Sequence, residues 1–311
     1  MPFDLLPHFF FALNDGGRLR YAQFAPSSNP CGTILIVPGR REFIEKKYAE
    51  CVPPLLDRGF RVVVVEMRGQ GLSSRFLKDD ERQRDHSDDF AVFLDDLRAF
   101  YAGVVLPGLT EPLIVHGHSL GGHLVLRWIA EDYPKVAGVF LTAPMVALSG
   151  MAAQTAAYGI SWASARLFSH ETHYAPTQHD FGDDDLVFAN NPLTHDEERF
   201  KIIENYFTAQ PDLTMGGVTW GWMLAALRSM HEANTWPYLA RIDMPVLALV
   251  GNHDPVTPPS EISPYLNHIP RVRTHVIEGA RHDLMNETDA VRTEAWGHID
   301  EFLKLVLAEG K

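Results

Sequence analysis

The sequence predicts an α/β fold, in which a mostly parallel central sheet is flanked by helices and interrupted by an inserted helical cap. Apolar, strand-like runs alternate with helical segments, as a parallel sheet requires. The runs 34–37 and 62–65 contain only Ile, Leu and Val, which is typical of central strands covered by helices on both faces. A third run, 113–116, leads directly into a glycine-flanked serine and then a helix. A chain of 311 residues, 46% of them hydrophobic, can bury a core of this size.

A hairpin is predicted to open the sheet. Strands over Phe9–Leu13 and Leu19–Phe24 flank Asn14-Asp15-Gly16-Gly17, whose residues favour a turn with positive φ. The charged stretch Lys78–Asp89 is predicted to be a solvated loop without a catalytic role. The other expected elements are, in order, strand 33–37, helix 42–58, strand 61–65, helix 88–105, strand 113–116, helix 120–130, strand 136–141, strand 246–250, strand 272–277 and helix 289–308.

The alternation of strands and helices breaks between Ala143 and Pro237. This segment is rich in alanine, aromatic residues and short helical patterns, so we expect a helical cap over 144–237 and a core domain made of 1–143 and 238–311. Its large apolar side chains either line a tunnel for an acyl chain or form the cap's own core. They are Tyr158, Trp162, Phe168, Phe181, Phe207, Trp220, Trp222 and Met223.

Composition narrows the classes of partner. The formal net charge of -13, without a basic stripe, argues against nucleic acid as a partner. Cys31 and Cys51 cannot form a disulfide framework, and the N-terminus does not resemble a signal peptide, so we expect a cytoplasmic protein with free thiols. No apolar stretch approaches the ~20 residues that span a bilayer. Membrane contact would therefore be peripheral, at the inner face; the oligomeric state stays unpredicted.

The stretch Gly117-His118-Ser119-Leu120-Gly121 has the form of a nucleophile elbow, a sharp strand-to-helix turn that exposes a serine. Glycine two residues before and two after the serine would avoid a steric clash in the turn. The amide of Leu120 would then point at the oxyanion of an attacked carbonyl. The alternative is a turn serine that only caps the helix.

A serine hydroxyl needs a base, and the base needs a carboxylate that fixes its tautomer. Asp254 follows the predicted strand 246–250, and His282 follows the predicted strand 272–277, where catalytic groups gather in parallel sheets. We therefore predict a triad of Ser119, His282 and Asp254. The neighbouring His253 and Asp283 are rivals for base and acid, but adjacent side chains on an extended loop point apart.

The second oxyanion donor is expected from the turn after strand 33–37, and its position favours the amide of Arg40. Pro38-Gly39 could instead be only a turn. Glu42 is expected to tie this loop down through a salt bridge. We expect three residues to contact the substrate, namely Gly39, His118 and Trp222.

Three histidines, His116, His118 and His123, surround the serine and raise the possibility of a metal site. No carboxylate or cysteine ligand is evident near them in the sequence. We therefore expect no metal and no cofactor, and we expect His118 to shape the pocket wall.

The elbow, Asp254, His282 and the segment Val65–Ser73 together resemble the α/β-hydrolase superfamily over nearly the whole chain. More narrowly, Gly39–Glu42, Arg68–Ser73 and Asn191-Pro192-Leu193-Thr194-His195 are similar to the bacterial lysophospholipase L2 group, relatives of the monoacylglycerol lipases. Pro38 and Glu66 depart from the pattern, which has histidine and often aspartate at these two places. Neither departure falls on the predicted triad.

The resemblance implies a serine hydrolase that cleaves the ester of a single-acyl lipid, a lysophospholipid or monoacylglycerol, through an acyl-enzyme. Arg40 or Arg41 could then meet a substrate phosphate. One alternative is a general short- or medium-chain carboxylesterase with the same triad. Another is a non-catalytic binding protein with this fold. Epoxide hydrolases and haloalkane dehalogenases require an aspartate where this chain has Ser119.

Overall fold

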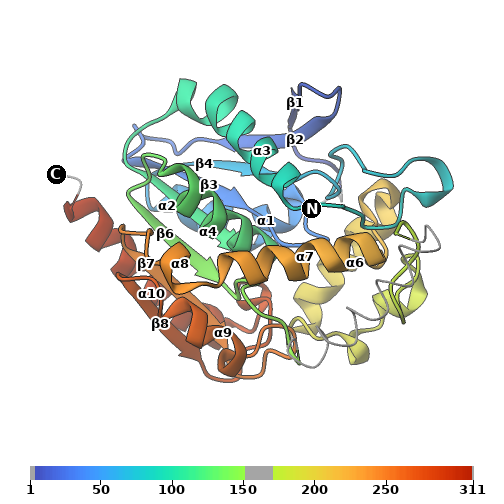
Figure 1. Cartoon of the computed structure of the whole chain (residues 1–311). Coiled ribbons are helices and arrows are strands. Elements are labelled where there is room, and N and C mark those ends of the chain that lie inside the picture. Colours follow the sequence, from blue (N-terminus) through green and yellow to red (C-terminus); the bar gives the residue numbers. More distant parts are fainter. Residues whose placement is uncertain (1–3, 151–170, 310–311) are drawn as a thin grey trace.

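The computed structural model describes residues 4–150 and 171–309. They form an eight-stranded sheet in the order β1-β2-β4-β3-β5-β6-β7-β8 (Figure 1). β1 pairs with β2 and β2 with β4 in antiparallel fashion, and all other pairs are parallel. The mostly parallel sheet and its opening hairpin are therefore confirmed. The strands are β1 (Phe9–Ala12), β2 (Arg18–Phe24), β3 (Gly32–Val37), β4 (Phe60–Val65), β5 (Leu113–His118), β6 (Gly138–Thr142), β7 (Val246–Gly251) and β8 (Val272–Ile277).

Helices cover both faces of the sheet because successive side chains of a strand point to opposite sides. In β3, Leu35 and Val37 pack in one core with helices α3, α4 and α7 to α9, whereas Ile34 and Ile36 pack in a second core with α1, α2 and α10. The helices are α1 (Ile44–Glu50), α2 (Val52–Asp57), α3 (Ala91–Phe100), α4 (Leu120–Asp132), α6 (Glu197–Ala209), α7 (Trp220–Ala233), α8 (Trp236–Leu239), α9 (Pro259–Leu266) and α10 (Asp289–Glu309).

Two strand registers bring the proposed site together. Val37 at the end of β3 pairs with Gly117 of β5, which sets the turn after β3 beside Ser119. Gly251 of β7 pairs with Ile277 of β8, which sets the loops carrying Asp254 and His282 side by side. The carboxyl ends of parallel strands share one edge of the sheet, so all these loops meet there.

Two expectations about local structure were wrong. The single helix expected over 42–58 is broken at Cys51 into α1 and α2, because Pro53 and Pro54 can only start a helix and cannot donate the hydrogen bonds that would continue one. The stretch Lys78–Asp89 is not wholly solvated, since Asp85, His86 and Ser87 are buried. The backbone of Asp85 hydrogen-bonds to Gly217 and Thr219, and this pairing carries the loop inward.

The segment between β6 and β7 contributes α6, α7, α8 and several short 3-10 turns, which agrees with the expected helical character. That residues 144–237 form a cap separate from the core domain stays a prediction. Tyr158, Trp162 and Phe168 lie outside the described residues. Among the described residues, no helix has the length and apolar character needed to cross a membrane.

Candidate active site

Ser119 occupies a strained turn between β5 and α4. Its φ of 47° lies in the region that L-residues avoid, and α4 begins at the very next residue, Leu120. A Cβ atom at Gly121 would lie 2.0 Å from the carbonyl oxygen of Val37, so only glycine fits there. The crowding of Gly121 thus comes from the end of β3, and Gly117 is crowded mainly by Gly122. The turn is the elbow that the sequence predicts.

The three residues of the predicted triad form one hydrogen-bonded chain, with His282 between Ser119 and Asp254. His282 Nε2 is 3.0 Å from Ser119 Oγ, and His282 Nδ1 is 2.8 Å from Asp254 Oδ2. All three side chains are buried. The rivals are turned elsewhere: the His253 ring lies 6.0 Å from the His195 ring, and the Asp283 carboxylate pairs with a lysine.

Asp254 is held as an ionised acceptor. Its Oδ1 accepts from the amides of Val256 and Thr257, and its Oδ2 accepts from the Thr257 hydroxyl at 2.7 Å as well as from His282. Burial alone would raise the pKa of Asp254, but the hydrogen bonds from His282 and Thr257 outweigh it and lower that pKa. An ionised Asp254 favours the tautomer of His282 that carries its proton on Nδ1 and leaves Nε2 free to accept from serine.

In the turn after β3, the amide of Arg40 lies between two amides that already donate hydrogen bonds. The Gly39 amide donates to Glu42 Oε2 at 2.5 Å, and the Arg41 amide donates to Gln70 Oε1 at 2.6 Å. Within 4–150 and 171–309, neither the Arg40 amide nor the Leu120 amide has a hydrogen-bond acceptor. Both are therefore available to an oxyanion formed at Ser119. Glu42 ties the turn down as expected, through Lys46 and Lys47.

The histidines around Ser119 are embedded in the core. His116 and His118 both approach the Thr142 hydroxyl, and His123 approaches Ser229. Burial lowers the pKa of His118 to about 4 and that of His123 to about 3, so both rings are neutral near pH 7. Neutral, hydrogen-bonded imidazoles of this kind are structural.

One set of side chains has metal-ligand geometry that the sequence did not reveal. Ligand atoms of Glu42, His118 and Asp283 lie within 4.8 Å of one another. Two ammonium groups already neutralise these carboxylates: Lys46 Nζ lies 2.7 Å from Glu42 and 2.5 Å from Asp283, and Lys47 Nζ lies 2.6 Å from Glu42. A divalent cation would have to displace them, so the group does not fit a metal.

A cavity of about 460 Å³ opens above Ser119 and His282. Four of the apolar residues singled out in the sequence line it, namely Phe181, Phe207, Trp222 and Met223, and Trp220 is not among its described lining residues. His118 is not among the described lining residues and its ring approaches Thr142, so its expected contact with substrate stays a prediction. Gly39 does not line the cavity among the described residues either; it packs against Ser119 and His118.

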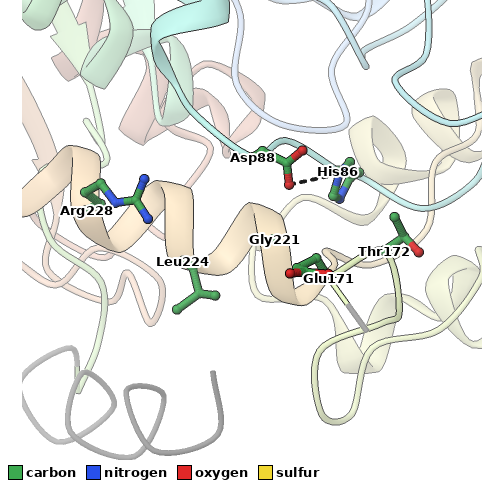
Figure 2. A pocket seen from close by; sticks show the side chains of 7 residues that line it. All are labelled: His86, Asp88, Glu171, Thr172, Gly221, Leu224 and Arg228. Carbon is green, nitrogen blue, oxygen red and sulfur yellow. Dashed lines mark ion pairs between the residues drawn. The ribbon is translucent and has the colours of Figure 1, made fainter. Parts of the chain in front are cut away.

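A second cavity, of about 550 Å³, shares none of these lining residues. Figure 2 shows its side chains: His86 and Asp88 lie 3.4 Å apart, and Arg228 lies further along α7. Glu171 and Thr172 lie near the N-terminal end of α7, away from Arg228 (Figure 2). Among the described residues that line this cavity, the charged side chains do not converge on one point in Figure 2, so they form no catalytic arrangement.

Three residues that shape the site were not identified from the sequence. Thr257 binds the proposed acid, Gln70 binds the oxyanion turn, and Asp85 pairs with the Arg40 side chain at 2.8 Å. A hydroxyl three residues after a loop aspartate is a recognisable turn signal and could have revealed Thr257. Asp85 lies in a charged stretch and gives no local signal of burial.

Comparisons with known proteins identify the family of the chain. The family model Hydrolase_4, described as serine aminopeptidase, S33, matches residues 28–289. Lysophospholipase L2 of Escherichia coli K12 is 27% identical over 294 residues, covering 86% of this chain and 79% of that protein. Human monoglyceride lipase is 29% identical over 157 residues, covering 50% of this chain and 48% of that protein. The structure of a monoglyceride lipase from Saccharomyces cerevisiae superposes with a TM-score of 0.71 at 17% identity, covering 96% of this chain and 94% of that one.

The family model covers most of the chain and includes all three residues of the predicted triad. The structural likeness independently supports the α/β-hydrolase fold that the motifs predict. The chain therefore belongs to the Hydrolase_4 (serine aminopeptidase, S33) family of serine hydrolases and, within it, is a relative of lysophospholipase L2 and the monoglyceride lipases.

Proposed function

We propose that this protein is a serine ester hydrolase that removes the acyl chain of a single-acyl lipid, a lysophospholipid or a monoacylglycerol. One observation carries the proposal: the hydrogen-bonded group of Ser119, His282 and Asp254 opens into a cavity of about 460 Å³ whose wall is largely apolar. Such a cavity holds an acyl chain and excludes water from the reacting bond. The names of the relatives point to the same substrates.

The mechanism follows from the distances. Ser119 Oγ attacks the ester carbonyl while His282 Nε2, 3.0 Å away, takes its proton. The amides of Arg40 and Leu120 stabilise the oxyanion of the tetrahedral intermediate. His282 then protonates the departing alcohol as the acyl-enzyme forms. Water attacks that acyl group by the same route, which releases the fatty acid and returns the proton to Ser119. Asp254 stabilises the imidazolium in both halves.

The wall of the cavity differs in chemistry from one part to another. One part is apolar, with Met145, Leu148, Val218, Trp222 and Met223. A second part carries charged side chains: Arg41 pairs with Asp185 and lies over the ring of Phe181, which in turn lies 5.1 Å from the ring of Phe207. We assign the acyl chain to the apolar part and the head group to the charged part. The predicted cap, 144–237, would then select the chain length.

The two arginines of the oxyanion turn are not equivalent. The Arg40 guanidinium donates to Asp85 and to the carbonyl oxygen of Gly216, so it is committed to the protein. The Arg41 guanidinium is partly exposed in the cavity, and within the described part of the chain its one ion pair is with Asp185 at 2.9 Å. A substrate phosphate could replace that carboxylate with little rearrangement. We therefore assign any phosphate contact to Arg41.

A substrate panel tests the proposal. Wild type and Ser119→Ala are compared on lysophosphatidylcholine, on monoolein and on p-nitrophenyl esters of increasing chain length. We expect medium or long acyl chains to be preferred and the alanine variant to be inactive. A steep preference for acetate or butyrate would favour a general carboxylesterase. If a fluorophosphonate probe fails to label the wild type, the protein is a non-catalytic member of the fold.

The phosphate contact has its own test. Arg41→Ala should lower kcat/KM on lysophosphatidylcholine more than on monoolein, because only the first substrate carries a phosphate. Arg82→Ala is a matched control, since Arg82 also pairs with an aspartate but does not line the cavity among its described residues. Equal losses on both substrates would exclude the phosphate contact and leave the rest of the proposal intact.

A further inference from the structure

Beside the proposed site lies a group of five buried ionisable side chains, which we term the buried charge cluster; two of them, Lys46 and Asp283, also line the cavity. Its members are Glu42, Lys46, Lys47, Glu50 and Asp283, each at most 5% exposed. Four of them lie in or just before α1, the helix that follows the oxyanion turn, and Asp283 directly follows His282. The cluster therefore lies between the two loops that must be aligned for catalysis.

Lys46 is the member that joins these loops. Its Nζ lies 2.7 Å from Glu42 Oε1 and 2.5 Å from Asp283 Oδ2. The other oxygen of Glu42 accepts the Gly39 amide, which precedes the proposed oxyanion donor at Arg40. A continuous set of contacts thus runs from the oxyanion turn through Lys46 to the residue beside the proposed base.

Lys47 contacts the same cluster without making this connection. Its Nζ pairs with Glu42 at 2.6 Å and Glu50 at 2.5 Å, and in the described part of the chain it forms no ion pair with Asp283. The two lysines carry the same charge, lie on the same helix and are both buried, and Lys46 alone of the two is among the described lining residues of the cavity. They differ in whether they reach the loop of His282, which makes them a matched pair for experiment.

The protonation states keep the connection strong. Burial would raise the pKa values of Glu42 and Asp283, but the adjacent lysines lower both pKa values, so each carboxylate is ionised. The three carboxylates outnumber the two ammonium groups by one. Burial raises the pKa of Glu50 to about 7, so Glu50 is the carboxyl group of the cluster that takes up a proton first as the pH falls. Glu50 lies 3.5 Å from Lys46 Nζ, farther than Glu42 and Asp283, which stay ionised. His118 stays neutral and does not compete with Lys46.

Stability is a weak reason for such a cluster, because well-packed apolar residues can replace buried ion pairs at no loss. We propose that Lys46 is a positioning residue that holds the oxyanion turn and the His282 loop in register, an inference that rests on the proposed function. Without the ammonium, Glu42 and Asp283 would repel each other across the gap it now fills. The two loops would then separate, and the Arg40 amide and His282 would lose their shared alignment on the ester.

The experiment compares Lys46→Met with Lys47→Met, each of which removes one buried ammonium group. Both variants should lose thermal stability, measured as Tm. We expect Lys46→Met to lower kcat by about 10- to 100-fold with little change in KM, the size of effect seen when transition-state contacts are misplaced. Lys47→Met should lower kcat several-fold less, and Lys46→Arg should recover most of the activity. Equal kcat losses in the two methionine variants would overturn the proposal.

Asp283→Asn keeps the test decisive if Lys46→Met does not fold. It cuts the same connection from the other side and leaves two carboxylates beside two ammonium groups, so we expect kcat to fall while Tm holds or rises. A folded Asp283→Asn enzyme with wild-type kcat would refute the role of Lys46. Fluorophosphonate labelling of the wild type is recorded alongside. Its absence would count against the proposed function itself, which separates that failure from a failure of the Lys46 proposal.

Discussion

Gln70 provides the sharpest test of how the oxyanion turn is held. Gln70 lies in the turn after β4, and its side chain is buried. Its Oε1 accepts a hydrogen bond from the Arg41 amide at 2.6 Å. Arg41 has a φ of 61°, a conformation that a non-glycine residue adopts only when its surroundings enforce it. Gln70→Met keeps the volume of the side chain and removes the acceptor.

The expected size of the effect follows from that one bond. An amide left without an acceptor costs about 1 to 3 kcal/mol, which favours rotation of the Arg41 peptide out of its strained conformation. The Arg40 amide belongs to the same turn and moves with it, away from the oxyanion. Losing one oxyanion donor costs on the order of 3 to 4 kcal/mol in the transition state. Partial loss of that donor should therefore lower kcat by about 10- to 200-fold.

Steady-state hydrolysis of one p-nitrophenyl ester measures kcat and KM, and circular dichroism checks that the variant is folded. KM should change little, because the Arg40 amide acts mainly on the transition state. Gln23→Met on β2 is the control for the same substitution away from the site. Wild-type kcat in a folded Gln70→Met enzyme would refute the claim that this hydrogen bond aims the Arg40 amide.

Three further outcomes are expected. Thr257→Val removes the hydroxyl that donates to Asp254 Oδ2, so kcat should fall about tenfold in steady-state assays; unchanged kcat would show that this hydroxyl is not needed to orient Asp254. Gly121→Ala should prevent folding or abolish activity, as followed by expression, Tm and turnover, whereas Gly297→Ala in α10, with nothing within 4 Å of its added Cβ, should be tolerated. Because burial raises the pKa of Glu50 to about 7, its contribution to stability is full below pH about 4.5 and is lost as the pH rises through 7. The Tm advantage of Glu50→Gln over wild type should therefore be larger at pH 8 than at pH 5, and an equal difference at both would contradict this pKa.

The parts of the fold that the sequence predicted are those with local causes. Runs such as 62–65 form central strands because branched apolar side chains fit a sheet covered on both faces. The elbow at Ser119 is recognisable because its glycines and its helix lie within a few residues of it. Asp254 and His282 were identified because each follows a strand, and strand ends meet at one edge of a parallel sheet.

The supporting residues escaped prediction because their partners lie far along the chain. Asp85 is buried through its pairing with Arg40, 45 positions away, and Lys46 through its pairing with Asp283, more than 200 positions away. A charged residue considered alone is expected at the surface, since burying an unpaired charge is costly. Only the tertiary structure shows which opposite charge offsets that cost. Charged stretches such as Lys78–Asp89 therefore conceal buried residues from any reading of one sequence.

Strained backbone conformations also gather near Ser119. Of the five non-glycine residues with positive φ among the described residues, three lie at the carboxyl ends of neighbouring strands: Arg41 after β3, Ser119 after β5 and Ala143 after β6. Each such conformation costs about 1 to 3 kcal/mol and persists only where surrounding contacts enforce it. Strain and buried charge together at the loops around Ser119 are what a site selected for geometry, at some cost in stability, would contain. The same reasoning explains why substitutions there should lower kcat more than they lower Tm.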